Sequence, residues 1–222
     1  SFTLTSSNGI GVIAVGQNRY AVTFNAGDGL DTVQIFNADT GVLHYKASTP
    51  AKVGGNFVHD GQGNLYFSVG KLVMHLSVPD KTIRQLASVQ GGITDLYDFQ
   101  LDYKGRLWAG TYPTGVVVCL DPASGKEITR TPRLGTGNHY ARGLSISPDG
   151  KTIWAGTGTA DPNLFRFDVD VPSTPKRVGI PGIGTNSIVA RTAARGRKVF
   201  VWHNDKAGKE ILSVYDTVAQ TW

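Results

Sequence analysis

Glutamate is nearly absent from this sequence. Its 17 acidic residues comprise 15 Asp and only two Glu, Glu127 and Glu210. A helical protein of this length would carry many more Glu, because straight side chains lose little rotamer freedom in a helix. The frequent Gly, Asp, Thr and Val residues are instead typical of turns and strands. The composition argues against a helix bundle, a Rossmann-type protein or a glycosidase with paired glutamates, and it predicts an all-β chain.

Cysteine and long apolar runs are also scarce. A single cysteine, Cys119, excludes an intrachain disulfide framework and a cysteine-rich metal site. It stands in the apolar run 116–120, where a small buried hydrophobe is expected rather than a nucleophile. No run approaches the roughly 18 apolar residues of a membrane helix, so we expect a soluble chain without a membrane partner. The first residue is Ser1 rather than Met, and removal of a secretory signal would fit a secreted, extracellular protein.

A pattern of short strands and turns recurs five times along the chain. Its clearest mark is the second strand of each unit, at residues 20–22, 65–67, 107–109, 153–155 and 199–201. The spacings of the central residues are 45, 42, 46 and 46, and these residues are Ala21, Tyr66, Trp108, Trp154 and Phe200. That period is typical of a four-stranded propeller blade of about 40–50 residues. The aromatic residues at this place are expected to pack between neighbouring blades.

The other strands of each unit follow the same order. Third strands are expected at residues 33–36, 72–76, 116–120, 164–167 and 211–215, with polar fourth strands such as 82–86 and 127–130. The last unit stops where its fourth strand would begin, and Phe2–Thr5 has the pattern of an outer strand that would close the last blade. We therefore predict a five-bladed β-propeller, or five blades of a larger one, as a single domain over residues 1–222.

Loops that join second to third strands, and one blade to the next, are expected to open on one face, where functional residues usually lie. The polar and aromatic residues of the blade-joining segments are Asn8, Asn56, Tyr97, Asp98, His139, Tyr140, Arg142 and Asn186. Those after the second strands are Asn25, Asp28, Thr111, Tyr112, Asp161, His203 and Asn204. The densest group is 138–142, at the start of the fourth unit.

Groups suited to proton transfer and to anion binding stand side by side in this group. We predict a catalytic set in which His139 or Tyr140 moves a proton and Arg142 holds a carboxylate, with His203 as the partner of His139. The predicted substrate-binding residues are Asn56, Tyr97, Asp98, Tyr112 and Asn186. A structural alternative stays open, in which Arg142 pairs with Asp98 or Asp102 and Tyr140 caps the channel.

The sequence gives little sign of a metal or other cofactor. Residues 25–31 carry oxygen ligands at short spacing, as calcium loops do, but without the full set and without a bidentate Glu. A solvated hairpin loop fits them better, so no cofactor is expected and calcium is a weak alternative. The formal net charge is +5, with basic residues concentrated late in the chain. Because no aromatic residues alternate with them, we expect acidic polysaccharide rather than nucleic acid as the partner.

Three segments resemble the blades of secreted microbial propeller proteins. They are GRLWAGTYPTGVVVCLDPASGKE, HYARGLSISPDGKTIWAGTG and NLFRFDVD, at residues 105–127, 139–158 and 163–170. Relatives of that group include polysaccharide lyases of the rhamnose–glucuronate type, which are larger propellers. The resemblance implies β-elimination on a uronic-acid-containing polymer. It also implies that His139 is the base, Arg142 the carboxylate partner, and Tyr140 or His203 the acid.

Two other function classes stay open. Five repeated units could form five similar pockets, as in a multivalent glycan-binding protein. The face residues differ from unit to unit, however, so a single central site is the better prediction, whether it is catalytic or only binds. A propeller that binds another protein is the third possibility.

Overall fold

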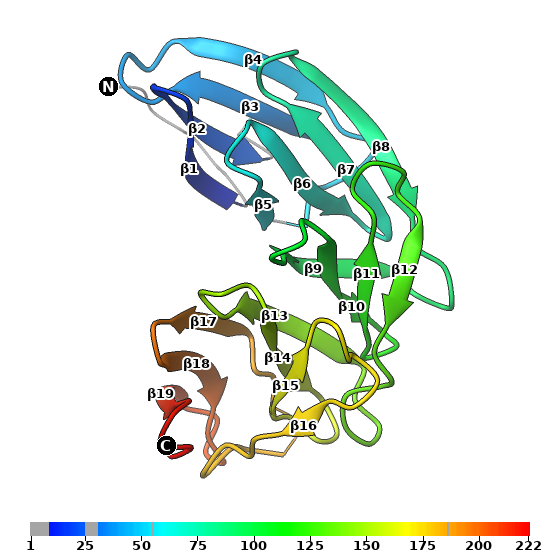
Figure 1. Cartoon of the computed structure of the whole chain (residues 1–222), viewed down its shortest axis with the longest axis vertical. Helices are drawn as coiled ribbons and strands as arrows, with labels where there is room; N and C mark the ends of the chain where they lie inside the picture. Colours follow the sequence, from blue (N-terminus) through cyan, green and yellow to red (C-terminus); the bar gives the residue numbers. More distant parts are fainter. Residues whose placement is uncertain (1–8, 25–30, 55, 186) are drawn as a thin grey trace. The chain divides into compact units, whose positions relative to one another are not determined.

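The computed structural model of the chain describes residues 9–24, 31–54, 56–185 and 187–222. Within these ranges all regular secondary structure consists of β-strands, and the strands form five antiparallel sheets of three or four strands (Figure 1). The all-β class predicted from the composition is therefore confirmed. In these same ranges, no helix is long and apolar enough to span a membrane.

The chain divides into two compact units, and the first covers Ser1–Gln90. It contains two sheets, each with four strands in chain order. The strands of the first sheet are β1 (Gly9–Val15), β2 (Asn18–Phe24), β3 (Thr32–Asn37) and β4 (Leu43–Ser48). Those of the second sheet are β5 (Phe57–His59), β6 (Asn64–Val69), β7 (Leu72–Ser77) and β8 (Thr82–Ser88). One core cluster, which includes Phe24, Ile35, Phe67 and Leu76, joins the two sheets.

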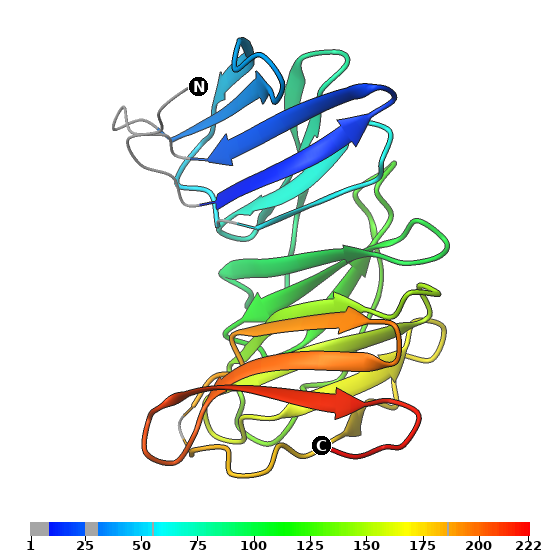
Figure 2. The same ribbon diagram turned by 90° about the vertical axis from the view of Figure 1, so that its left-hand side faces the viewer.

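The second unit covers Gly91–Trp222 and contains three sheets. The strands of the third sheet are β9 (Asp95–Leu101), β10 (Leu107–Tyr112), β11 (Val117–Leu120) and β12 (Glu127–Arg130). Those of the fourth sheet are β13 (Tyr140–Ile146), β14 (Thr152–Gly158), β15 (Leu164–Asp168) and β16 (Lys176–Arg177). The fifth sheet has β17 (Arg191–Arg195), β18 (Lys198–Asn204) and β19 (Glu210–Asp216), which lie side by side in Figure 2.

The predicted second strands are the second strands of the observed sheets. The five central residues that set the repeat lie in β2, β6, β10, β14 and β18. The Trp108 ring packs on Phe167 at a centroid distance of 5.4 Å, and the Trp154 ring packs on Tyr215 at 5.7 Å. Each contact joins two neighbouring sheets, so the packing role predicted for the aromatic residues is confirmed for Trp108 and Trp154. Cys119 is buried among apolar residues of the same core, as expected.

Small residues in the second strands let the neighbouring sheet approach closely. The sequence Trp-Ala-Gly-Thr occurs twice, at residues 108–111 and 154–157. A Cβ atom on Gly156 would lie 2.6 Å from the carbonyl oxygen of Val189, and one on Gly110 would overlap the carbonyl oxygen of Ala141. Both obstructing atoms are backbone atoms of the segment that leads into, or forms, the first strand of the next sheet. The repeated glycine is therefore a requirement of packing between sheets.

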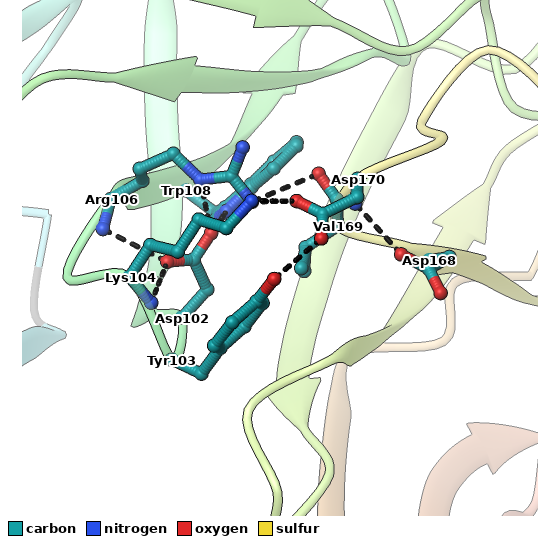
Figure 3. Close-up of polar contacts among 8 residues, drawn as sticks. All are labelled: Asp102, Tyr103, Lys104, Arg106, Trp108, Asp168, Val169 and Asp170. Carbon is teal, nitrogen blue, oxygen red and sulfur yellow. Dashed lines mark hydrogen bonds and ion pairs between the residues drawn. The ribbon is translucent and has the colours of Figure 1, made fainter.

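Asp102 stabilises the turn between β9 and β10. Its carboxylate accepts hydrogen bonds from Arg106 Nε at 2.7 Å and from Trp108 Nε1 at 2.8 Å (Figure 3). It also accepts from the backbone N–H groups of Lys104 and Arg106, at 2.9 and 3.0 Å. The side chain of Asp102 is wholly buried. This hairpin turn is thus built around a fully hydrogen-bonded buried carboxylate.

Asp170, in the turn after β15, connects this hairpin to the fourth sheet. Its carboxylate accepts from Tyr103 Oη at 2.6 Å and from Lys104 Nζ and an Arg106 guanidinium nitrogen, both at 2.8 Å (Figure 3). The hydrogen bonds from Lys104 and Tyr103 hold the pKa of Asp170 well below its usual range. The network lies at the opposite end of β10 from Tyr112, so it fixes the sheets without entering the predicted site.

Three predictions about the architecture stay predictions. The strand Phe2–Thr5, which would close the last blade, lies outside the described residues. The number of blades and the single domain over residues 1–222 are likewise not tested. In the described part of the chain the fifth sheet has three strands, and Thr221 turns back to form a bridge with Asp216.

Candidate functional site

Five of the predicted site residues lie together at one end of the third and fourth sheets. We call Tyr97, Tyr112, His139, Tyr140 and Arg142 the Tyr–His–Arg cluster. The Tyr140 ring lies 4.6 Å from the Tyr112 ring and 5.8 Å from the Tyr97 ring, measured between centroids. The His139 ring meets Tyr112 edge-on at 6.4 Å. The guanidinium carbon of Arg142 lies 5.2 Å from the centroid of the Tyr97 ring.

The topology of the two sheets brings these side chains together. Tyr112 is the last residue of β10, whereas Tyr140 is the first residue of β13, and Tyr97 and Arg142 follow inside β9 and β13. The end of a second strand and the beginning of the next sheet therefore meet at one edge. This is the juxtaposition that the loop positions predicted from the sequence.

Asn138 fixes the segment that carries His139 into β13. Its side chain is fully buried, and Nδ2 donates to the carbonyl oxygens of Leu134 at 2.7 Å and Asp161 at 2.6 Å. Its Oδ1 accepts from the backbone N–H of Asp161 at 2.8 Å. The role of Asn138 could not be predicted from the sequence. The position of Asn138 directly before His139 indicated that it lies near the site. Its hydrogen bonds to Asp161 could not be inferred, because Asp161 is distant in sequence.

The charge of Arg142 is not neutralised by an acidic side chain among the described residues. The structural alternative, a pair between Arg142 and Asp98 or Asp102, is wrong because both carboxylates have other partners. Asp98 accepts from Arg191 at 3.3 Å and from the backbone N–H of Leu144 at 3.2 Å. Asp102 pairs with Arg106. The half-buried Arg142 guanidinium, held against the Tyr97 ring by cation–π attraction, therefore keeps donors for an anionic ligand.

Tyr97 keeps its phenolic proton over the whole physiological range. Its pKa is raised from the ordinary value of 10.0 to about 12, mainly by burial and also by the nearby Tyr140 and Asp95, while Arg142 opposes the rise. A phenol with this pKa is a poor base at neutral pH, but it can donate a hydrogen bond to a ligand oxygen. Within the cluster, Tyr97 is thus suited to hydrogen bonding rather than to proton abstraction, and its assignment as a substrate-binding residue stays a prediction.

This shift predicts a stability difference at alkaline pH. Because the pKa of Tyr97 is higher in the folded chain, the neutral phenol favours folding below the unfolded value of about 10, and this contribution is lost as pH rises towards about 12. We expect the fall in unfolding free energy between about pH 10 and about pH 12 to be smaller in Tyr97→Phe, as measured by urea unfolding. Equal pH dependence in the two proteins would contradict the shift.

His203 does not belong with the Tyr–His–Arg cluster. It is almost fully buried, at 1% exposure, inside β18. Its Nδ1–H donates to the carbonyl oxygen of Asn204 at 3.2 Å, and Nε2 accepts from the Ser213 hydroxyl at 2.9 Å. Both ring nitrogens are therefore used within the fifth sheet, and the role of His203 as a partner of His139 or as the acid is corrected to a structural one. The sequence could not show this, because exposure of a loop-proximal histidine depends on tertiary packing.

The other predicted binding residues have separate placements. Asp98 is buried at 8% exposure. It connects β9 to Leu144 of β13 and to Arg191 of β17, so its carboxylate links the third, fourth and fifth sheets to one another. Asn56 lies in the first unit, directly before β5. Asn186, together with Asn8, Asn25 and Asp28, lies outside the described residues.

The structure adds no metal site to this picture. Within the described ranges, no group of three or more His, Cys, Asp or Glu side chains is arranged to hold a metal ion. The weak calcium prediction concerned residues 25–31, of which only Asp31 is described. Cavities that surround Arg166 lie on the fourth and fifth sheets, and no residue of the Tyr–His–Arg cluster lines them.

Comparison with known proteins identifies the fold. No known family profile matches the chain, and no curated protein matches it. Among solved structures, the chain is similar to selenomethionine-substituted virginiamycin B lyase from Staphylococcus aureus, with a TM-score of 0.69 and 11% sequence identity. The match covers 93% of this chain and 69% of that chain. The fold is a β-propeller. At this level of identity, the similarity shows the fold alone. It does not indicate which residues of this chain are functional or which substrate it binds.

The propeller fold accounts for the place of the cluster. In a propeller, the ends of second strands and the segments between blades lie on one face. Tyr112 ends the second strand β10, and His139 lies in the segment that leads into β13. The predicted propeller resemblance is therefore supported, while the likeness to rhamnose–glucuronate lyases finds no support at the level of a protein family.

Proposed function

We propose that this propeller is a lyase that cleaves a uronic-acid-containing polysaccharide by β-elimination at the Tyr–His–Arg cluster. The observation that carries the proposal is Arg142, a cation without an acidic partner among the described residues, held in a group of three tyrosines and a histidine. Elimination next to a carboxylate needs a cation for that carboxylate, a base, and a proton donor, and this group contains each of them.

In the proposed reaction, Arg142 binds the uronate carboxylate through its guanidinium. This contact also stabilises the enolate that forms when the adjacent C–H proton is lost. His139 accepts that proton, since its exposed ring lies at the edge of the cluster beside Tyr112. Tyr140 takes the role of the acid, because His203 is buried elsewhere. Tyr97 and Tyr112 would present hydrogen bonds and ring faces to the sugar.

The step balances without an oxidant or an added cofactor. The base removes the proton on the carbon next to the carboxylate, and the electron pair of that C–H bond forms a C=C bond to the neighbouring carbon. The bond from that second carbon to the glycosidic oxygen breaks, and Tyr140 supplies a proton to this oxygen. The products are a shortened polysaccharide and a chain that ends in an unsaturated uronate.

Two further facts support the proposal. The solved propeller reported above is named as a lyase, the same broad class of reaction, although its name concerns a different molecule, virginiamycin B. The net charge of +5 favours the approach of a polyanion. We place the activity outside the cell, with acidic polysaccharide as partner and neither nucleic acid nor membrane required.

Replacing Arg142 by Gln tests the proposal. We expect glucuronate-containing polysaccharides to yield unsaturated uronate, detected by its ultraviolet absorbance, and Arg142→Gln to lower kcat/KM by about 10- to 100-fold, since one charge-assisted contact is lost. Arg84→Gln, which removes an equal charge from an exposed position of β8, is the matched control and should stay within about twofold. Absence of product from the unsubstituted protein across a broad panel of uronate polymers would overturn the proposal.

A binding module is the second candidate. The Tyr140 ring packs against the Tyr112 and Tyr97 rings at centroid distances of 4.6 and 5.8 Å, and a group of tyrosines offers ring edges and hydroxyl groups to a sugar. In this case the same polysaccharides bind with one site per chain, no product forms, and Arg142→Gln weakens binding. Calorimetry combined with product detection separates this outcome from the lyase.

A further inference from the structure

A group of adjoining cavities surrounds Arg166 on the fourth and fifth sheets. Three cavities, of about 410, 300 and 240 Å³, all have Arg166 in their lining. Lys176 lines the two larger ones, and Lys198 of β18 lines the smallest. We call this region the Arg166 groove. All of its residues belong to the second unit, and none belongs to the Tyr–His–Arg cluster.

Cations outnumber acids along the Arg166 groove. The largest cavity is lined by Arg166, Lys176 and Arg177 and by no acidic side chain. Of these three, Arg177 is paired with Asp161 at 2.9 Å. Each of the other cavities contains one carboxylate, from Asp168 or Asp149, against two cations. The groove therefore has an excess of positive charge.

Arg166 and Lys176 face one another directly across two paired strands. They are register partners of β15 and β16, so their side chains project from the same side of the sheet. Like charges at directly opposite positions of a strand pair destabilise it. An anion between the two side chains would relieve this repulsion and gain hydrogen bonds from both.

The Arg166 guanidinium is held against the Trp154 ring, and its N–H groups have no hydrogen-bond acceptor among the described residues. Its central carbon lies 5.8 Å from the centroid of the Trp154 ring, and Trp154 is itself buried. The Arg166 side chain makes no hydrogen bond or ion pair within the described part of the chain. A planar guanidinium fixed in this way can bind a carboxylate or sulfate through two parallel hydrogen bonds.

We propose that the Arg166 groove is a second binding site, which holds carboxylate- or sulfate-bearing sugar units of an acidic polysaccharide. Only the choice of ligand rests on the proposed function. The lining favours sugar over nucleic acid: Thr152, Thr174 and Gln220 offer polar partners for hydroxyl groups, and Trp222, at 36% exposure, offers a ring face. The other three aromatic rings in the lining, Trp154, Phe167 and Tyr215, are buried and give nucleobases nothing to stack on.

Charge-removing variants test the groove by binding alone. At low ionic strength, we expect Lys176→Gln and Arg166→Gln each to raise the Kd for polyglucuronate and for dextran sulfate by about tenfold. Lys209→Gln, an exposed charge in the same unit outside these cavities, should change Kd by less than about twofold. Arg166→Lys should give an intermediate Kd, since it keeps the charge but not the paired donors. If Arg166→Gln fails to fold, Lys176→Gln on the exposed edge strand decides alone.

The outcomes distinguish this site from the proposed activity. Loss of polymer binding in Lys176→Gln supports the groove even if no uronate polymer is ever cleaved. Full turnover by the unsubstituted protein, with equal Kd values in Lys176→Gln and Lys209→Gln, overturns the groove and leaves the lyase intact. Single-stranded or duplex DNA that binds more tightly than the sugar polymers and responds to the same variants overturns the choice of ligand.

Discussion

Replacing Asp102 by Ala is expected to lower the free energy of unfolding by about 3–5 kcal/mol, as measured by urea or thermal unfolding. Asp102 is buried, and its carboxylate accepts from Arg106 Nε, Trp108 Nε1 and two backbone N–H groups (Figure 3). Removing it leaves four donors without their acceptor, one of them on a guanidinium whose side chain is only 18% exposed. The cost of these unsatisfied groups, rather than a lost Coulomb attraction, determines the size of the effect.

Asp170 provides the matched control for this prediction. It contacts the same Arg106 and belongs to the same network, but its side chain is 39% exposed. Water can replace the hydrogen bonds of an exposed carboxylate, so Asp170→Ala should change stability only slightly despite the lowered pKa of Asp170. Equal losses in Asp102→Ala and Asp170→Ala would show that burial does not govern the contribution of Asp102.

Replacing Gly156 by Ala is expected to destabilise the second unit by about 3 kcal/mol or more. The added methyl carbon would lie 2.6 Å from the Val189 carbonyl oxygen and 2.5 Å from a Val189 side-chain carbon. The side chain of Val189 can rotate, but its carbonyl oxygen cannot move without shifting the segment before β17. The sheets must therefore separate, which opens the core that includes Trp154, Val189 and Tyr215.

Gly110→Ala repeats the test between the third and fourth sheets. The same four-residue sequence occurs there, and the obstructing atom is again a backbone oxygen, that of Ala141. Ala14→Ser, which adds one atom at an exposed position of β1, should leave the melting temperature nearly unchanged. If Gly156→Ala and Gly110→Ala are as stable as the unsubstituted protein, close approach of backbone is not the reason for the repeated glycine.

The strands could be predicted because their signals are local. Ala21, Tyr66, Trp108, Trp154 and Phe200 recur at the spacing of a blade, and each lies in a second strand of an observed sheet. Alternating side chains and turn residues act within a few positions of each other, so a single sequence carries them. The gathering of Tyr112, His139 and Tyr140 followed from the same strand order, since strand ends meet where consecutive sheets adjoin.

Partner choice could not be predicted in this way. The sequence offered Asp98 and Asp102 as partners of Arg142, but they pair with Arg191 and Arg106. Arg191 lies in β17, two sheets away in sequence from Asp98 in β9. Whether a guanidinium reaches one carboxylate or another depends on rotamers and on the approach of neighbouring sheets, which local patterns do not encode.

Local sequence patterns specified the all-β class, the repeated order of the strands and the end of the sheets at which Tyr112, His139 and Tyr140 gather, because these depend on short-range periodicity and turn chemistry. Tertiary structure alone decided which residues are accessible and charged without a partner. It buried His203, it neutralised Asp98 and Asp102, and it left Arg142 beside Tyr97 and Arg166 beside Trp154 without acidic partners among the described residues. Burial and pairing arise from contacts between sheets distant in sequence, and these contacts exist only once the chain is folded.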